Sequence, residues 1–406
     1  MLRGGARFAR SPGLIARLVA PGFQSILDRL DAGFERGQLL GHLPDGSTCI
    51  LGGRAPGFEA EVTLHDWRAL IRLATAGSIG WYQAWEAGEW KSPDLVPVFG
   101  LFSDNAVALG NVGRASGPFR LAARIAHRFN RNSRRGVQRN IHAHYDLGND
   151  FYRQWLDPSM TYSSARFDGT DNLETAQHNK WRALADRIGK PETVLEIGCG
   201  WGSLANFLQT CGSQVTAISL SDEQLDWARR RQDQRISFLK QDYRDTSGQF
   251  DAIVSVEMVE ALGREYWPTF MDCVARNLRP GGRAAIQYIS MQDDIFDAYA
   301  KSADFIQAYI FPGGLLIRTS EFRKLAEERG LAWRDQADFG LDYARTLHCW
   351  RDGFDAAVDE GRLPEGFDER FIDMWRFYLD YCEGGFRGGS INVHQVTLVR
   401  EEDACG

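Results

Sequence analysis

Short apolar runs alternate with amphipathic stretches in the second half of the chain, and this alternation predicts a sheet of mostly parallel strands joined by helices. The apolar runs give the expected strands 193–197, 214–219, 236–240, 251–256 and 283–289. The amphipathic stretches give the expected helices near 173–188, 202–211, 222–232, 264–278 and 320–329. We therefore predict an α/β fold, a Rossmann-like doubly wound sheet that binds its ligands at the carboxyl ends of the strands.

The C-terminal part of the chain departs from this alternation. Segments 331–338 and 392–399 are expected to add a closing antiparallel hairpin to the sheet. Between them lies an aromatic-rich stretch, from Arg345 to about Tyr381, which is expected to be a helical insertion.

The N-terminal part has a third pattern. From about 35 to 103, alternating segments such as Ser47–Leu51 and Glu61–Leu64 surround turn signals and precede a helical stretch at His65–Ala76. This part is predicted to be a small α+β domain with its own core. Residues 1 to about 30 fit either an interfacial helix or a helix packed on this domain.

A glycine-rich turn follows the first expected strand of the sheet. Residues Val194–Gly202 indicate a buried strand that runs into a turn opening a helix, where Gly198, Gly200 and Gly202 let the backbone approach a ligand. An ordinary tight turn is the alternative. The spacing G-x-G-x-G, with no carboxylate after the next strand, disfavours a nicotinamide cofactor. Preceded by Glu196, the turn resembles the first motif of S-adenosylmethionine methyltransferases.

Length and composition are those of a globular protein with two domains, since the chain has 406 residues and 44% apolar content. No window approaches the roughly 18 apolar residues of a membrane span, and the first residues lack the apolar stretch of a signal peptide. A cytoplasmic location is therefore expected. The cysteines are scattered without a C-x-x-C pair, which predicts reduced thiols and no metal site. His348 and His394 are expected to be structural.

Charge is unevenly distributed, although the net charge is −7. No acidic residue lies between Asp104 and Asp146, an interval rich in arginine. The arginines are Arg114, Arg120, Arg124, Arg128, Arg131, Arg134, Arg135 and Arg139. This stretch is either a solvated linker or a site of attraction to phosphate-rich surfaces. Its aromatic residues, Phe119 and Phe129, are too sparse to stack nucleic-acid bases, which favours anionic lipid over nucleic acid.

Six motifs occur in an order that resembles the cyclopropane fatty acid synthase family, including its mycolic acid methyltransferase branch. They are His144–Tyr152, Tyr162–Ser163, the glycine turn, Gln241–Asp245, Tyr309–Gly314 and Tyr343–Leu347. The resemblance covers about 141–400 and continues more weakly through Trp85–Trp90 and Phe102–Asn105, which look like the family's lipid-handling domain. It implies three parts: a lipid-binding-like domain at 1–105, a basic linker at 106–140 and a class I methyltransferase domain at 141–406.

The resemblance also implies the cofactor site. In the family, the residues matching Tyr162, Ser163, Gly198, Gly200, Ser219, Gln224 and Tyr243 surround S-adenosylmethionine. Glu196 and Gly202 join them as parts of the glycine motif. Asp242 is expected either to accept a hydrogen bond from the adenine amino group or to cap the following turn. The substrate tunnel is expected to include Tyr309, Phe311, Leu315 and Leu316, for which core packing is the alternative.

The family transfers a methyl group to a carbon–carbon double bond of an acyl chain, and the resulting carbocation must lose a proton. Resemblance implies that ring-forming members use bicarbonate as the base, held by a cysteine, a glutamate, a histidine and a tyrosine. Glu260 matches the glutamate and Tyr343 matches the tyrosine. The cysteine position, however, is Ser164, and the histidine position is Gln287. Neither replacement changes charge near neutral pH, which makes bicarbonate doubtful.

Glu257 offers another base. It stands where ring-forming members often have glycine, three residues before Glu260. We hypothesise that its carboxylate replaces bicarbonate, because a second carboxylate and a lipid-lined pocket raise the pKa of a carboxyl group. The alternative makes Glu257 a strand-end residue paired with an arginine.

The product expected from this arrangement is a methyl-branched unsaturated chain in membrane phospholipid. The alternatives are a cyclopropane synthase that uses bicarbonate, a methyltransferase for a small or isoprenoid substrate, and a non-catalytic lipid-binding protein. The family implies a homodimer bound peripherally to the inner face of the cell membrane, with no nucleic-acid partner. A saturated branch would need a hydride donor, which makes a redox partner protein conceivable.

Overall fold

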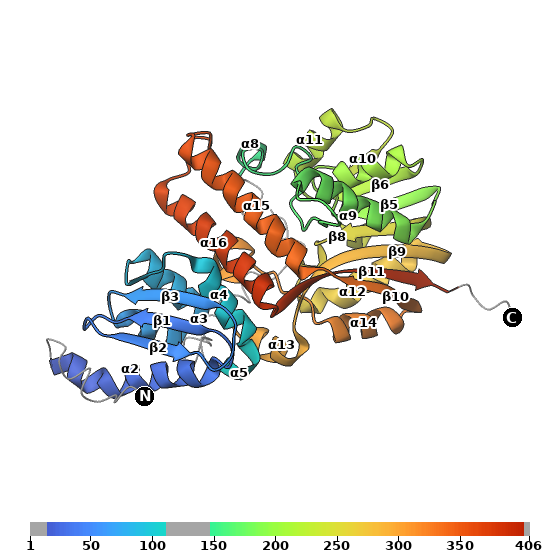
Figure 1. Ribbon diagram of the computed structural model, residues 1–406. Coiled ribbons are helices and arrows are strands. Elements are labelled where there is room, and N and C mark those ends of the chain that lie inside the picture. Colours follow the sequence, from blue (N-terminus) through green and yellow to red (C-terminus); the bar gives the residue numbers. More distant parts are fainter. Residues whose placement is uncertain (1–13, 111–146, 402–406) are drawn as a thin grey trace. The chain divides into compact units, whose positions relative to one another are not determined.

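The computed structural model describes residues 14–110 and 147–401 (Figure 1). The arginine-rich stretch and the start of the His144–Tyr152 motif lie outside the described residues. The chain divides into two compact units, each assembled from separate stretches. Of the described residues, the first unit combines 14–110 with Asp294–Pro312 and Asp368–Ile391, and the second unit contains the others. The units are thus discontinuous, whereas the sequence led us to expect contiguous domains.

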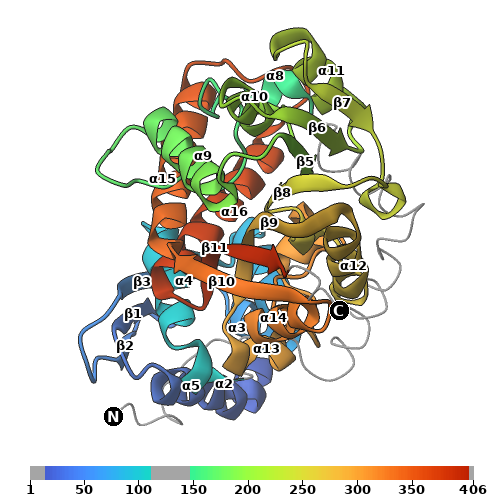
Figure 2. The ribbon, with the colours of Figure 1, turned by 90° about the vertical axis from the view of Figure 1, so that its right-hand side faces the viewer.

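The second unit contains a seven-stranded sheet in the order β10-β11-β9-β8-β5-β6-β7, visible from β7 down to β10 in Figure 2. The strands are β5 (Thr193–Ile197), β6 (Gln214–Ser219), β7 (Ser237–Lys240), β8 (Phe250–Val256), β9 (Leu278–Met291), β10 (Leu331–Asp338) and β11 (Ile391–Arg400). Strands β5 to β9 pair in parallel, and β10 pairs with β11 in antiparallel orientation. The predicted doubly wound sheet and its closing hairpin are confirmed.

Strand β9 is longer than the predicted strand 283–289, because it begins at Leu278 and continues through the Pro-Gly-Gly sequence before residue 283. In the structure a register shift between Phe250 and Ala252 of β8 absorbs the irregularity, and Leu278 already pairs with Phe250. Residues 279–282 have no partner in β8 in this register, and a bulge of this kind disrupts the ladder locally without ending the strand.

Helices cover both faces of this sheet (Figure 1). They are α9 (Leu173–Ile188), α10 (Ser203–Thr210), α11 (Asp222–Arg231), α12 (Trp267–Asn277) and α14 (Thr319–Glu327). Helices α9 to α11 bury Trp181, Leu204 and Leu225 in one core cluster with residues of the strands. On α12 and α14, Phe270 and Phe322 stack, and Phe322 also contacts Tyr288 of β9. Shorter elements are α8 (Asn149–Tyr152) and the turns η1 (Tyr243–Asp245), η2 (Val259–Ala261) and η3 (Arg264–Tyr266).

The expected helical insertion consists of two helices, α15 (Gly340–Asp359) and α16 (Glu369–Gly388), and they belong to different units. Helix α16 packs on α4 (Leu95–Asp104) of the first unit. A Cβ atom on Gly384 would lie 2.5 Å from Cβ of Phe99, and Gly388 lies as close to Ser103. Glycines at these positions let the two backbones approach. This close packing, rather than sequence position, places α16 in the first unit.

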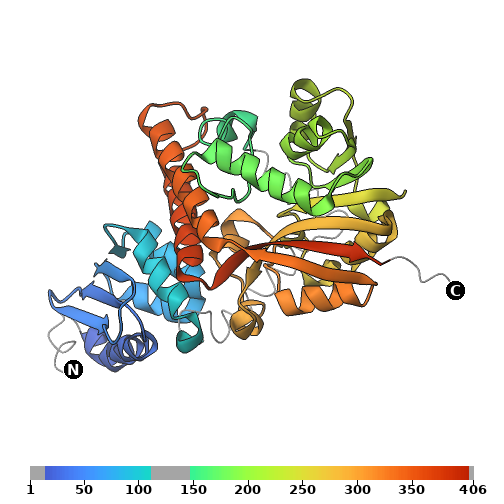
Figure 3. The same cartoon turned by 45° about the vertical axis from the view of Figure 1, so that its right-hand side comes forward.

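The first unit has a four-stranded sheet in the order β2-β1-β3-β4, with α2 (Leu14–Gly33) beside it (Figure 3). Its strands are β1 (Gln38–His42), β2 (Thr48–Gly52), β3 (Glu59–Leu64) and β4 (Trp90–Lys91). Its other helices are α3 (Arg68–Glu86), α5 (Ala106–Leu109), α13 (Asp293–Tyr299) and the π-helical turn η4 (Ile306–Ile310). The predicted small α+β domain is confirmed, with two later segments of the chain added to it.

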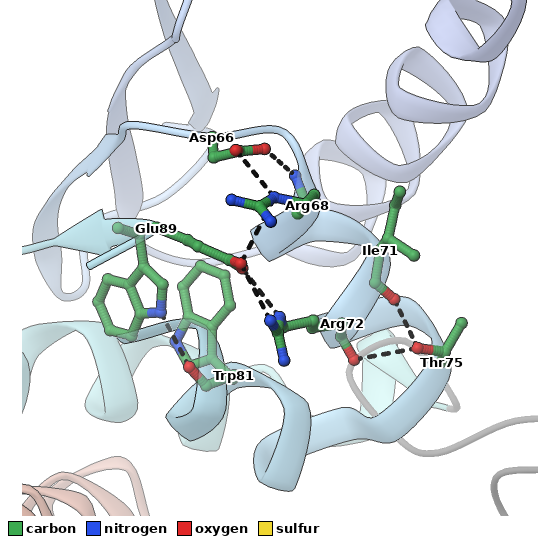
Figure 4. Close-up of polar contacts among 8 residues, drawn as sticks. Asp66, Arg68, Ile71, Arg72, Thr75, Trp81 and Glu89 are labelled. Atoms are coloured by element: carbon green, nitrogen blue, oxygen red, sulfur yellow. Dashed lines mark hydrogen bonds and ion pairs between the residues drawn. The ribbon is translucent and has the colours of Figure 1, made fainter. Parts of the chain in front are cut away.

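A buried carboxylate fixes the turn between α3 and β4 (Figure 4). Glu89 is 3% exposed and accepts two hydrogen bonds from Arg72, at 2.9 and 3.1 Å, while Arg68 lies 3.6 Å away. Beside it, the indoles of Trp81 and Trp90 stack with ring centroids 4.1 Å apart. A buried carboxylate paired with a bidentate arginine satisfies both charges and holds its surroundings in one geometry.

Candidate active site

The glycine turn lies between β5 and α10, at the carboxyl end of the central strands of the second sheet. Gly198, Gly200 and Gly202 have φ values of 84°, 50° and 85°, which favour glycine. A Cβ atom on Gly198 would lie 2.7 Å from Met258, and one on Gly202 would lie 2.8 Å from Phe238. Gly200, by contrast, faces space with no atom within 4 Å. The turn thus packs tightly on the protein at two glycines and leaves the third open to a ligand.

Glu196 on β5 is 3% exposed and accepts a hydrogen bond from the backbone of Ala205 on α10. Burial raises the pKa of this carboxyl group to about 8. Its Oε2 atom is buried and has no hydrogen-bond partner within the described residues. A buried acceptor without a partner beside an open backbone turn fits a polar ligand such as the amino-acid end of S-adenosylmethionine.

The other expected cofactor residues follow the next two strands. Ser219 ends β6, and its hydroxyl lies 3.3 Å from Oε1 of Gln224 on α11. Asp242 caps η1 by accepting from the Arg244 amide and also pairs with the Arg244 guanidinium at 2.5 Å. The capping alternative for Asp242 is therefore seen, and an adenine amino group would share the carboxylate with Arg244. The Tyr243 hydroxyl is buried with no partner among the described residues.

Tyr162 and Ser163 lie on the segment before α9. Tyr162 packs among the rings of Tyr152, Trp155 and Trp350, with centroid distances between 5.1 and 5.7 Å. Ser163 accepts a hydrogen bond of 2.6 Å from the ammonium of Lys180, a residue that the sequence reading missed.

Glu257 directly follows β8 and is the centre of a hydrogen-bond network. Its Oε1 atom accepts from the Ser164 amide at 2.9 Å and from Nε2 of Gln287 at 2.7 Å, and its Oε2 atom accepts from the Tyr343 hydroxyl at 2.9 Å. Glu257 has a φ of 47°, in the left-handed region that few residues other than glycine adopt. Strained backbone held by surrounding contacts is common at functional sites.

The amide of Gln287 has a defined orientation. Its Oε1 atom accepts a hydrogen bond of 3.0 Å from Gln395, and its Nε2 also lies 3.3 Å from the Ser164 carbonyl oxygen. The donating end must therefore face Glu257. Gln287 and Gln395 are both fully buried, so this orientation is fixed by partners and not by solvent. Gln395 is a second residue that the sequence reading missed.

Burial raises the pKa of Glu257, while Lys180, Gln287, the Ser164 amide and Tyr343 act in the opposite direction. Glu260 lies close enough for the Glu257 charge to add to burial in raising the pKa of Glu260 to about 8. Glu260 accepts from the Ile289 amide, and its Oε2 atom is buried without a partner in the described part of the chain. The charge of one glutamate thus raises the pKa of the other, and a strand end and a 3₁₀ turn bring the two together.

This geometry argues against bicarbonate. The Ser164 amide, the Gln287 amide and the Tyr343 hydroxyl are the donors that would hold an oxyanion, and all three donate to the Glu257 carboxylate. A bound anion would also meet two carboxylates. Among the described residues no arginine pairs with Glu257, so the arginine alternative finds no support there.

The expected tunnel residues fall into two groups. Leu315 and Leu316 belong to the second unit, where the Leu315 amide donates to the Glu260 carbonyl oxygen at 2.8 Å. Tyr309 and Phe311 belong to the first unit, where Tyr309 accepts a hydrogen bond from Gln83 at 3.1 Å. Leu315 is therefore tied to the Glu257 region, and the tunnel assignment of the two aromatic residues stays a prediction.

A separate Ser–His–Asp chain joins three strands of the second unit. Nε2 of His394 lies 2.6 Å from the Ser290 hydroxyl, and Nδ1 lies 2.7 Å from Asp338. A serine nucleophile needs free amide donors beside it for an oxyanion. The amide after Ser290 already donates to the Ile317 carbonyl oxygen. We therefore assign Ser290, His394 and Asp338 a structural role, in line with the expectation for His394.

The strand order and the glycine turn after β5 define a Rossmann-like methyltransferase. A solved structure supports this class: the mycolic acid cyclopropane synthase CmaA1, complexed with SAH and CTAB, superposes with a TM-score of 0.59 and 26% identity. The match covers 64% of this chain and 98% of the other. S-adenosylmethionine is therefore the cofactor, as the sequence predicted.

The family follows from sequence comparison. The family described as mycolic acid cyclopropane synthetase matches residues 132–396. Tuberculostearic acid methyltransferase UfaA1 of Mycobacterium tuberculosis is 38% identical over 368 residues, which cover 86% of this chain and 84% of the relative. Cyclopropane-fatty-acyl-phospholipid synthase of Escherichia coli is 33% identical over 356 residues, 86% and 90% of the two chains. The chain belongs to this family and is an S-adenosylmethionine-dependent C-methyltransferase of the cyclopropane synthase type.

Proposed function

We propose that this enzyme methylates a carbon–carbon double bond in an unsaturated acyl chain of membrane phospholipid and leaves a methyl-branched unsaturated chain. The single observation that carries the proposal is the position of the Glu257 carboxylate, which binds the three donors that would otherwise hold an oxyanion. Two relatives support the substrate class, since one is named a tuberculostearic acid methyltransferase and the other a fatty-acyl-phospholipid synthase.

S-adenosylmethionine supplies the methyl cation. The π electrons of the alkene form the new carbon–carbon bond as the sulfur–carbon bond breaks, which leaves a positive charge on the other alkene carbon. The Glu257 carboxylate then takes a proton from the neighbouring chain carbon, and the electrons of that carbon–hydrogen bond form a new double bond. One methyl cation is added, one proton is removed and one double bond is re-formed, so atoms and charge balance without a further reactant.

Three features suit Glu257 to this step. Burial raises its pKa, so its carboxylate accepts a proton more readily than an exposed one does. Its hydrogen bonds fix both oxygens in place. Its negative charge also stabilises the developing carbocation, an interaction that is stronger in a site from which water is excluded.

The test uses S-adenosylmethionine with a trideuterated methyl group and vesicles of unsaturated phospholipid, followed by mass spectrometry of the released fatty acids. We expect three retained deuterium atoms and a retained double bond. Two retained deuterium atoms would mean that the methyl group itself lost the proton, as in ring formation, and would contradict the proposal. Three deuterium atoms with loss of the double bond would indicate a saturated branch and a hydride donor.

The substrate places the enzyme at a bilayer surface. No helix in residues 14–110 or 147–401 is long and apolar enough to cross a membrane. We propose that the arginine-rich stretch between Asp104 and Asp146 binds anionic headgroups, each arginine near the surface contributing about 1 kcal/mol. Cosedimentation with anionic vesicles, lost in high salt and absent with zwitterionic vesicles, tests this. Homodimer formation, a redox partner and the cytoplasmic location remain predictions.

A further inference from the structure

Helix α9 buries a charged residue within its apolar face. Trp181, Leu184 and Ile188 of this face pack in the core of the second unit. Lys180 belongs to the same buried stripe and is 1% exposed. Lysine is almost never fully buried unless its charge is paired, because an isolated buried charge is costly. The structure must therefore give this ammonium partners that offset its desolvation.

The partners of Lys180 lie at the junction of the cofactor site and the base. Its Nζ donates to the Ser163 hydroxyl at 2.6 Å, and Gln177, one helical turn earlier, donates to the Ser163 carbonyl oxygen at 3.1 Å. The next residue, Ser164, donates its amide to Glu257. Helix α9 therefore binds the hydroxyl and the carbonyl oxygen of Ser163, and the next residue, Ser164, binds the Glu257 carboxylate.

The charges of three carboxylates act on this one cation. Glu257, Asp157 and Glu196 all interact with the Lys180 charge, in that order of strength. Asp157 and Glu196 are buried, and each has one carboxylate oxygen without a hydrogen-bond partner among the described residues. Without a nearby cation, burial would favour the protonated form of Glu257, and that proton would prevent it from acting as a base.

We propose that Lys180 is a positioning residue of the reaction. Its ammonium, hydrogen-bonded to the Ser163 hydroxyl, keeps Glu257 in its ionised form. The same contact links the expected cofactor residue Ser163 to the segment that binds the base. The inference rests on the proposed function in taking Glu257 as the base. It adds a residue with no direct part in the methyl transfer, placed between the cofactor cradle and the proton acceptor.

The other groups around Glu257 do not supply this charge. Gln287, Tyr343 and the Ser164 amide donate neutral hydrogen bonds, and Glu260, whose pKa is raised to about 8, offers no positive charge. Lys180 is the cation that opposes burial of Glu257. Burial lowers the pKa of Lys180 to about 8, which leaves it charged in the acidic and neutral range where Glu257 is at risk of protonation.

The test is the pH profile of kcat for the full chain acting on phospholipid vesicles. The acidic limb reports ionisation of the base in the substrate complex. In Lys180→Gln, which keeps a donor for Ser163 but removes the charge, we expect the limb to move to higher pH by about one unit. Activity should then fall about tenfold on the acidic side and stay within about threefold on the plateau. Lys180→Arg, which keeps the charge, should restore the limb.

A uniform loss at every pH, with the limb unmoved, would show a merely structural role and overturn the inference. If Lys180→Gln does not fold, Asp157→Asn carries the test with a change of opposite sign. It keeps the acceptor that binds the Ser159 amide and removes one competing negative charge, so the limb should move to lower pH. An unmoved limb in that variant would also overturn the inference.

Glu257→Gln separates this inference from the proposed function. If that variant keeps full product formation, the base assignment fails whatever Lys180 does. If that variant is inactive and Lys180→Gln leaves the limb in place, the base assignment stands and only the inference about Lys180 fails.

Discussion

The cofactor half and the base half of this site are built in different ways. The cofactor half, defined here as Glu196 with the three glycines up to Gly202, comes from consecutive residues where one strand meets one helix. The base half, defined as Glu257 with Ser164, Gln287 and Tyr343, comes from four segments far apart in the chain. A local motif can hold a cofactor shared by many enzymes, whereas the base half that we propose depends on contacts between distant segments.

The substitution with the largest expected effect changes the base half alone. Glu257→Gln removes the proton acceptor and keeps the shape of the side chain, and general-base catalysis contributes about 10²–10⁴-fold, so kcat should fall by that range. Binding of S-adenosylmethionine, measured by calorimetry, should change little. Glu192→Gln is the matched control, because Glu192 is exposed at the amino end of β5. Equal activity of the two variants would remove Glu257 from the mechanism.

The substitution with the next largest expected effect changes the cofactor half alone. In Gly200→Ala the new Cβ projects into the open side of the turn, so the KM for S-adenosylmethionine should rise about tenfold, comparable to one lost hydrogen bond. Gly212→Ala is the control, since Gly212 also has positive φ and open space around it. Both variants should lose about 1–2 kcal/mol of stability from the backbone conformation. A KM that rises equally in both would point to general destabilisation.

A third change weakens one donor of the base half. Tyr343→Phe removes the hydrogen bond to Oε2 of Glu257, and a bond to a charged group contributes about 1.5–3 kcal/mol. Because this donor stabilises the ionised carboxylate, its loss raises the pKa of Glu257 further. The acidic limb of the pH profile should therefore move to higher pH. Activity at pH values on that limb should fall about tenfold. An acidic limb at the wild-type position would show that the phenol does not act on Glu257.

The substitution with the smallest expected effect tests whether the base half extends to Gln395. Gln395→Leu removes the donor that orients Gln287, so the Gln287 amide can rotate and kcat should fall roughly threefold, within the range of one neutral hydrogen bond. Gln395 and Thr397 both contact Arg187, at 3.4 and 3.2 Å. Thr397→Val therefore loses the shared arginine contact without touching Gln287. Equal rates for the two variants would place Gln395 outside the network.

Local patterns predicted the methyltransferase sheet well. The strands at 193–197 and 214–219 were placed to the residue, because their apolar runs end in glycine or serine turns that the chain cannot continue as strand. Strand β9 and helix α16 were harder. A register shift holds β9 together across a Pro-Gly-Gly sequence, and close helix packing at Gly384 places α16 in the other unit. Both depend on partners that are distant in sequence.

The base half shows the same limit. The resemblance supplied Glu260, Ser164, Gln287 and Tyr343 as neighbours, and Glu257 was added as a hypothesis because it departs from the family pattern. The direction of each hydrogen bond to Glu257 came from the structure. Lys180 and Gln395 carry no motif. A lysine within an apolar helical stripe is the signal that could have revealed Lys180, and Gln395 lies in a strand that gives no sign of its partner.

The sequence by itself determined the class of fold, the cofactor and the family, because each depends on local periodicity or on short motifs that keep their meaning wherever they fold. The tertiary structure decided which donors bind the Glu257 carboxylate and which hydroxyl binds the Lys180 ammonium. Those are questions of a few ångströms between segments that are distant in the chain, where burial sets the energy of each charge and only the packed protein fixes which charges meet.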